Sequence, residues 1–178
     1  AQGAFIAIGA VVGARLVGAG IPTIAAAPAA AVAGGVAAAA TGAAFGRLPR
    51  AGFDAATWIV SWLVAAALDS LTWPLGGSQG VVVTAGPSTT GHYELALALT
   101  AVSALGFLAL ARSPVGLRLA AARDREAAAN ELGIPVARLR IAAVAASGAV
   151  AGLSGALAVE LAGVGDPSRY DSYLSFKL

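Results

Sequence analysis

Few side chains in this 178-residue sequence could do acid–base, nucleophilic or metal chemistry. Cysteine is absent, which excludes disulfides, thiolate metal ligands and thiol nucleophiles. The single histidine, His92, has no second histidine with which to form a zinc site or a proton relay. The net charge of +2 is too small to indicate a nucleic-acid partner. The residue types therefore predict no catalytic site, no metal centre and no nucleic-acid-binding surface.

A glycine-rich run could suggest a nucleotide-binding loop, and it consists of Gly76, Gly77, Ser78, Gln79 and Gly80. A phosphate-binding loop of this kind ends in Lys followed by Ser or Thr, and no such pair follows Gly80. We therefore interpret the run as a turn or as a contact for a binding protein. We expect no nucleotide or other cofactor to bind the chain directly.

The densest group of charged side chains lies between Ser113 and Pro135. Ser113 offers a capping hydroxyl and Pro114 suits the first helical position, so a helix is predicted to begin here. No helix breaker follows until Gly133, which suits the position just beyond a helix end, and Pro135 stops any continuation. The segment therefore predicts an amphipathic helix or a pair of helices.

Two interpretations of this segment are open. It is either a solvated connector with ordinary charge pairs, or an element that contacts a partner, because a connector in a compact bundle needs only a few residues. Arg123 and Glu126 are spaced to form an ion pair on a helix. Four apolar or small residues recur at helical spacing on one face, namely Leu117, Ala121, Ala128 and Leu132.

The elements around this segment are strongly apolar. Hydrophobic residues make up 58% of the sequence and charged residues 11%, whereas soluble domains carry about 45–50% and about 25%. A bilayer core about 30 Å thick needs about 20 apolar residues in a helix. Five stretches approach or reach this length. We therefore predict an all-α membrane protein, a polytopic bundle of about five transmembrane helices, at residues 3–19, 21–45, 53–73, 93–111 and 139–163.

The arginines indicate how this bundle is oriented. The link between the second and third stretches contains Arg47 and Arg50. The link between the fourth and fifth contains six more, Arg112, Arg118, Arg123, Arg125, Arg138 and Arg140. These two links lie on the same side if five spans alternate, and the intervening links contain no basic residue. Since basic residues concentrate in cytoplasmic loops, we expect both links in the cytoplasm.

Small residues dominate the predicted spans, with 48 alanines and 23 glycines in the chain. Alanine is nearly neutral for membrane insertion, so these helices gain little by facing lipid alone. Glycines four residues apart allow helix backbones to approach closely, and this spacing occurs at Gly9 and Gly13, at Gly42 and Gly46, and at Gly148 and Gly152. The composition therefore predicts a tightly packed bundle.

Several motifs resemble those of the branched-chain amino-acid ABC importer permeases. The run Ser113-Pro114-Val115-Gly116, followed by Arg123-Asp124-Arg125-Glu126, Ala128-Ala129 and Leu132-Gly133-Ile134, is similar to the cytoplasmic loop of that family. Gly3-Ala4-Phe5 with Ile8-Gly9-Ala10 resembles an early stretch, and Leu71-Thr72 with Gly76–Gly80 resembles an external loop. The order of the motifs agrees along most of the chain. Family members are generally longer, so we expect this chain to be a fragment.

The resemblance implies a single permease domain over residues 1–178, which crosses the bacterial inner membrane several times and has no enzymatic activity of its own. It implies a cytoplasmic coupling helix within residues 112–140 that docks on an ATPase through Arg123, Arg125, Glu126, Ala128, Ala129 and Gly133. The implied partners are a second permease subunit, two ATPase subunits that use ATP, an external substrate-binding protein and the lipid bilayer. Two alternatives stay open, which are a permease for another small solute such as an amide or urea, and a structural membrane subunit without transport.

Overall fold

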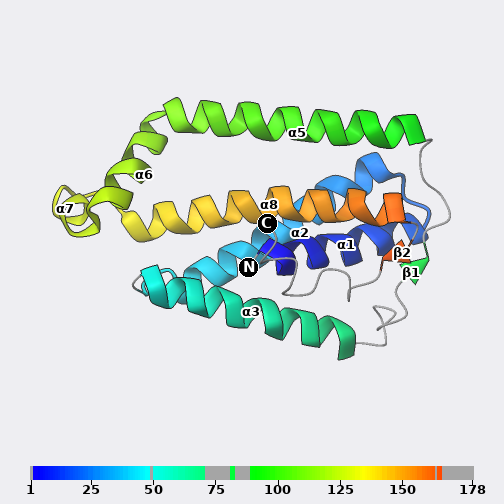
Figure 1. Cartoon of the computed structure of the whole chain (residues 1–178), viewed down its shortest axis with the longest axis horizontal. Helices are drawn as coiled ribbons and strands as arrows, with labels where there is room; N and C mark the ends of the chain where they lie inside the picture. The colour runs from blue at the N-terminus through cyan, green and yellow to red at the C-terminus, as the bar shows by residue number, and fades with distance from the viewer. Residues whose placement is uncertain (1, 49, 71–80, 83–88, 163, 166–178) are drawn as a thin grey trace.

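The chain forms a bundle of helices, as a computed structural model describes it for residues 2–48, 50–70, 81–82, 89–162 and 164–165. The helices in chain order are α1 (Gln2–Gly18), α2 (Thr23–Phe45), α3 (Arg50–Ser70), α5 (Thr89–Arg112), α6 (Pro114–Asp124), α7 (Glu126–Glu131) and α8 (Val136–Ala162). Two strands of two residues each, β1 (Val81–Val82) and β2 (Val164–Gly165), pair antiparallel beside them (Figure 1).

Each of the five stretches predicted to span the membrane is helical over most of its described length. Three helical segments are long and apolar enough to cross a bilayer, Thr23–Phe45, Tyr93–Arg112 and Val136–Val159. Two shorter apolar helices accompany them, Gln2–Gly18 and Gly52–Leu68. The described residues therefore confirm the predicted all-α membrane bundle, with three helices of spanning length and two that are shorter.

The core of the bundle lies where α1, α2 and α8 run side by side (Figure 1). Its buried side chains are mostly alanine, with Phe5, Val17 and Val159 as the larger members. A Cβ added at Gly34 of α2 would lie 2.9 Å from the Cα of Gly152 on α8, and one added at Gly13 of α1 would lie 2.9 Å from the Cα of Ala156. These backbones approach closely because glycine has no Cβ, as the small-residue spacing predicts.

A tight turn carries the chain from α1 to α2. Gly20 has a φ of +85°, a conformation that glycine adopts without steric cost. The N–H of Gly20 donates to the Val17 carbonyl at 2.9 Å, and that of Ile21 donates to the Leu16 carbonyl at 3.0 Å. This hydrogen-bond pattern ends α1 and turns α2 back along it.

The helices α3 and α5 lie outside this core. The face of α3 that carries Val64 and Leu68 packs on α1, while Trp58 and Trp62 on its other side are half-exposed. No residue of α5 between Tyr93 and Arg112 is buried. Phe107 in the second half of α5 is 70% exposed, and Tyr93 in its first half is 68% exposed, so this helix presents apolar side chains along its length. Such side chains suit contact with lipid tails or with other helices.

Candidate functional site

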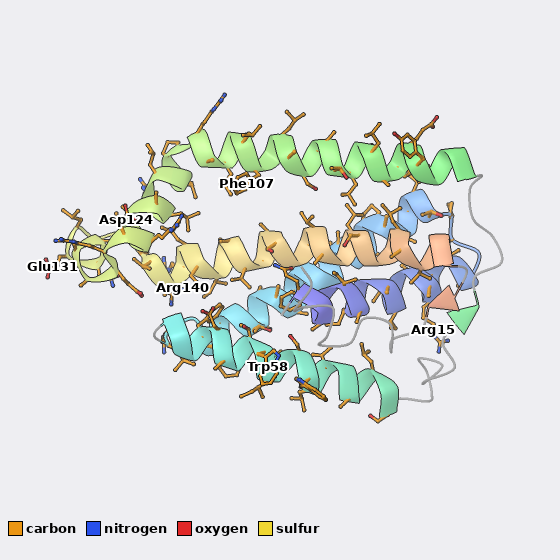
Figure 2. All side chains as sticks on the ribbon, in the orientation of Figure 1. Arg15, Trp58, Phe107, Asp124, Glu131 and Arg140 are labelled. Atoms are coloured by element: carbon orange, nitrogen blue, oxygen red, sulfur yellow. The ribbon has the colours of Figure 1, made fainter. Side chains whose placement is uncertain are left out.

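The described arginines other than Arg15 gather at one end of the bundle, which we call the arginine-rich end. It contains the link after α2, the end of α5, the helices α6 and α7, and the start of α8 (Figure 1). Asp124, Glu131 and Arg140 lie at this end, whereas Arg15 lies at the opposite one (Figure 2). The prediction that the two arginine-containing links share one side is therefore confirmed.

Helix α6 begins as the sequence predicts. Ser113 is its N-cap, and the Ser113 hydroxyl accepts a hydrogen bond from the Gly116 N–H at 3.2 Å. The same hydroxyl donates to the Leu110 carbonyl at 2.7 Å, near the end of α5. Pro114 occupies the first turn, where its missing N–H costs nothing. One serine therefore fixes both the end of α5 and the start of α6.

The predicted helix or helical pair is a pair, and it is divided at Arg125. This residue has φ −147° and ψ 93°, an extended conformation between α6 and α7. Its N–H still donates to the Ala121 carbonyl at 3.1 Å, and its carbonyl accepts from the Ala129 N–H at 3.0 Å. Because Arg125 is neither glycine nor proline, the sequence gives no signal for a break at this position.

Gly133 lies just beyond the end of α7, as predicted. Gly133 has a φ of +76°, and its N–H donates to the Asn130 carbonyl at 3.0 Å. The N–H of Ile134 donates to the Ala129 carbonyl, also at 3.0 Å. This is the two-bond arrangement of a Schellman motif, which needs a left-handed residue just past the helix end.

The structure separates the predicted contact residues into two groups. Ala129 is 2% exposed and packs within the chain. The other five are exposed, Arg123, Arg125, Glu126, Ala128 and Gly133. The four residues of the predicted apolar face are exposed, and the extended backbone at Arg125 separates the two on α6 from the two beyond it. Leu117 and Leu132 are 68% and 79% exposed.

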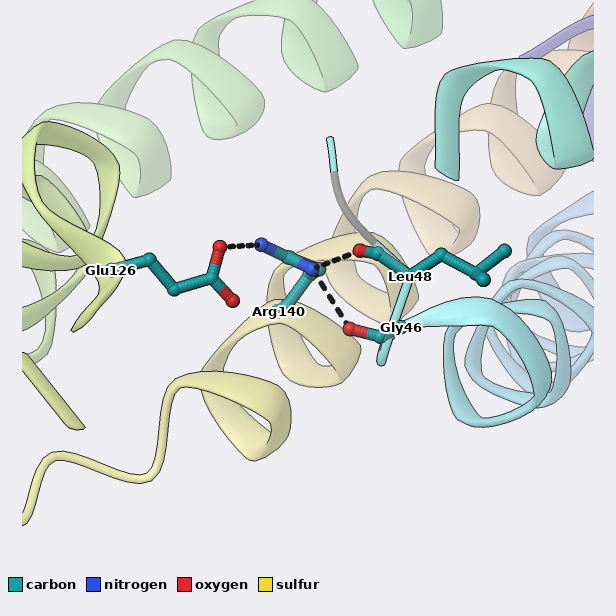
Figure 3. A network of polar contacts seen from close by, with 4 residues as sticks. All are labelled: Gly46, Leu48, Glu126 and Arg140. Carbon is teal, nitrogen blue, oxygen red and sulfur yellow. Dashed lines mark hydrogen bonds and ion pairs between the residues drawn. The ribbon is translucent and has the colours of Figure 1, made fainter. Parts of the chain in front are cut away.

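The predicted ion pair between Arg123 and Glu126 does not form. Glu126 pairs with Arg140 of α8, and not with Arg123, with 3.0 Å between Arg140 Nη2 and Glu126 Oε2 (Figure 3). The extended backbone at Arg125 lies between Arg123 and Glu126, so the two are not three residues apart on one continuous helix. The spacing rule that predicted the pair therefore does not apply here.

Arg140 is a candidate functional residue that no sequence pattern singled out. Its Nη1 donates to the carbonyls of Gly46 at 2.8 Å and Leu48 at 3.2 Å, in the link that follows α2 (Figure 3). Its guanidinium carbon lies 5.9 Å from the centre of the Phe53 ring on α3, within cation–π range. Gly46 is 94 positions away in sequence, so no local pattern could predict this contact.

An open cavity of about 440 Å³ lies beside Arg140. Its walls come from α3, α6, α7 and α8, and they combine apolar side chains with charges of both signs. The lining residues are Phe53, Asp54, Leu119, Ala122, Arg123, Glu126, Val136, Arg140, Ala143 and Val144. The cavity lies between the helical pair and the bundle, and beside it the two are connected by the chain at Ser113 and Gly133, by contacts of α6 with α8, and by Arg140.

The predicted external loop, Gly76 to Gly80, lies outside the described residues. The nearest described element after it is β1, which pairs with β2 at the end of the bundle that carries Arg15.

Comparison with known proteins identifies a family. The family of the permease component of branched-chain amino acid transport systems matches residues 1–178, which is the whole chain. No curated protein and no solved structure matches it. The helical membrane bundle and the capped helical pair at its arginine-rich end agree with the motifs on which the resemblance rests. The chain therefore belongs to the permease components of branched-chain amino acid transport systems.

Proposed function

We propose that the chain is the permease subunit of an ATP-driven importer for branched-chain or related small amino acids, which depends on an external binding protein. Beyond family membership, the observation that carries this proposal is the exposed helical pair α6 and α7. The pair is capped by Ser113 at its start and by Gly133 at its end, and Ala129 is its one buried residue. Its surface is therefore available to another protein.

The arginine-rich end is assigned to the cytoplasm. Basic residues close to membrane spans favour the cytoplasmic side, and the described arginines other than Arg15 lie at this end. In a bacterium this orientation places the helical pair on the inner face of the inner membrane, where ATPase subunits are available. The opposite end, with Arg15 and the β1–β2 pair, then faces the binding protein.

In this mechanism the chain transmits movement and does not itself hydrolyse ATP. Two ATPase subunits bind ATP and close together, and each carries the coupling segment of one permease subunit with it. The small side chain of Ala128 lets the partner approach the helix closely, while Arg123, Arg125 and Glu126 supply polar contacts around it. The Gly133 turn fixes the angle at which α7 meets α8.

Site-directed cross-linking tests the docking assignment. Because the chain has no cysteine, Ala128→Cys introduces a single thiol on the exposed face of α7. In the full-length permease expressed with its ATPase, this thiol is expected to form a cross-linked product with the ATPase through a short bifunctional reagent. Ala19→Cys is the control, because Ala19 is exposed and lies at the opposite end of the bundle, where its N–H donates to the Arg15 carbonyl. Equal cross-linking of both variants would reject the assignment.

Uptake measurements in proteoliposomes test the transport assignment. Leucine uptake is expected to require ATP, the ATPase and the binding protein together. Competition by amides or urea, without competition by leucine, would instead assign another small solute. Uptake without ATP would indicate a secondary transporter, and an assembled complex without any uptake would indicate a structural membrane subunit.

A further inference from the structure

We propose that Arg140 is the joint through which α6 and α7 move the core of the bundle. It is a positioning residue, since it is argued to act through the elements it holds and not on a substrate. The proposal rests on the proposed function, because it assumes that the helical pair receives the movement of an ATPase. It adds a specific path from that pair into the membrane.

Arg140 occupies a place where four elements meet. It lies in the second turn of α8, the helix that packs on both α1 and α2. Its side chain, 22% exposed, reaches Glu126 of α7 on one side. On the other side it reaches Gly46 and Leu48 after α2 (Figure 3). Its guanidinium also lies over the ring of Phe53 on α3. One guanidinium therefore joins the helical pair to three elements of the bundle.

The chemistry of the contacts favours arginine. Nη1 donates to two carbonyl oxygens while Nη2 donates to a carboxylate, so the planar guanidinium holds acceptors on both sides in fixed directions. The Gly46 carbonyl belongs to the C-cap of α2, where carbonyls lack helical partners and the helix dipole favours a cation. A lysine has one nitrogen and cannot reach the same three acceptors in this geometry.

The two helices of the pair meet the bundle differently, since α6 continues from α5 at Ser113 and also contacts α8, whereas α7 is joined to α8 at Gly133 and through Glu126. Helix α6 has no buried residue, and Ala129 is the buried residue of α7. A displacement of α7 reaches α8 directly through the chain at Gly133 and through the Glu126–Arg140 pair. Because Arg140 holds the end of α2 directly, movement of Glu126 is passed to α2 as well as to α8.

The test compares Arg140→Gln with Arg138→Gln in the complete transporter. Arg138 lies two residues before Arg140 in α8, is exposed, and makes no hydrogen bond or ion pair with the described residues. Both variants lose one positive charge. We expect Arg140→Gln to keep its ATPase and its hydrolysis, while the ATP hydrolysed per leucine imported rises about tenfold, the factor typical of losing hydrogen bonds to a charged group. Equal ratios in the two variants would overturn the proposal.

Exchanging the charges at positions 126 and 140 tests whether the ion pair alone is sufficient, or whether Arg140 must also hold the carbonyls of Gly46 and Leu48. The double variant Glu126→Arg with Arg140→Glu restores opposite charges, but a glutamate at 140 cannot donate to the Gly46 and Leu48 carbonyls. We expect it to remain uncoupled, and full recovery would show that the ion pair alone suffices. Arg140→Lys, which keeps the charge, is expected to lie between wild type and Arg140→Gln, and it provides the same comparison if Arg140→Gln fails to fold.

Distance measurements separate failure of this proposal from failure of the proposed function. Spin labels at Ala44→Cys and Leu132→Cys, both exposed positions, report the separation of α2 from the end of α7 in the cysteine-free chain. In the full-length permease we expect a narrow distribution of distances between the two labels. This distribution is expected to broaden in Arg140→Gln but not in Arg138→Gln. Identical distance distributions in wild type and Arg140→Gln would reject the proposed role of Arg140. The label-to-label distances can change as expected while wild type shows no ATP-dependent uptake. In that case the proposed function fails, but the role of Arg140 in holding α7 against α2 stands.

Discussion

Gly34 of α2 and Gly152 of α8 face each other at backbone distance, since a Cβ added at Gly152 would lie 3.1 Å from the Cα of Gly34. Gly148, one turn earlier on α8, meets the same segment of α2, with its added Cβ 2.7 Å from the Gly34 carbonyl oxygen. In a membrane, where lipid tails are as apolar as leucine, such close packing is a main source of helix association.

The first prediction concerns this contact. Gly152→Val places a branched side chain against Gly34 and Ala30, which belong to the facing backbone. Overpacking of this kind costs about 1–3 kcal/mol or more, so we expect a lower melting temperature of the permease in detergent. Gly106→Val on α5 is the control, because a Cβ at Gly106 has no atom within 4 Å. Equal melting temperatures would show that the glycine contact does not hold the bundle.

The second prediction separates the paired alanines of α7. Ala129 is 2% exposed, whereas its neighbour Ala128 is exposed. Ala129→Leu is therefore expected to destabilise α7 and the adjoining turn, which faster hydrogen exchange over residues 126–134 would report. Ala128→Leu is expected to leave exchange unchanged and to weaken co-purification of the ATPase. The reverse pattern would show that the buried alanine, and not the exposed one, makes the contact.

The third prediction concerns the turn at Gly133. Its φ of +76° strains residues with a Cβ, and a Cβ there would meet no atom within 4 Å, so the effect of substitution is backbone strain alone. Gly133→Val is expected to cost about 1–2 kcal/mol and to reduce uptake. Gly133→Asn is expected to be close to wild type, since asparagine tolerates this conformation. Similar uptake by both variants would argue against a requirement for the left-handed turn.

The fourth prediction concerns the cap of α6. Ser113→Ala removes the acceptor for the Gly116 N–H and the donor to the Leu110 carbonyl. Losing an N-cap costs about 1 kcal/mol, so the amides at the start of α6 are expected to exchange faster. Ser113→Asp keeps a capping oxygen and is expected to restore protection at Gly116. If Ser113→Ala exchanges at the wild-type rate, Pro114 alone is sufficient to start the helix.

Local rules predicted the parts of this fold that depend on neighbouring residues. Ser113, Pro114 and Gly133 set the ends of the helical pair because capping and left-handed turns are decided within four or five residues. The glycine spacing on α1 and α8 predicted close packing, because a helix repeats its face every three or four residues. Residue composition was enough for the membrane bundle.

The remaining features depend on contacts between distant segments. The break at Arg125 carries no glycine or proline, so the extended conformation there has no local signature. Helical spacing favoured Arg123 as the partner of Glu126, whereas the fold brings Arg140 to it. The Gly46–Arg140 contact joins residues 94 positions apart, which a periodic pattern cannot encode. These three features define the candidate site, and they follow only from the assembled helices.

The alanine and glycine surfaces between α2 and α8 also affect how freely these helices can rearrange. Alanine and glycine have no rotamers, so no side-chain conformational entropy is lost when they are packed or regained when they separate. Interlocked leucines or phenylalanines would have to change rotamer before one helix could slide along the other. At Gly34 and Gly152 the facing surface is backbone, and at Gly148 it adds only the methyl group of Ala38, so a shift of α8 along α2 requires no change of side-chain rotamer. The interface between α2 and α8 therefore contains few large side chains that would hinder a movement of these helices during a transport cycle.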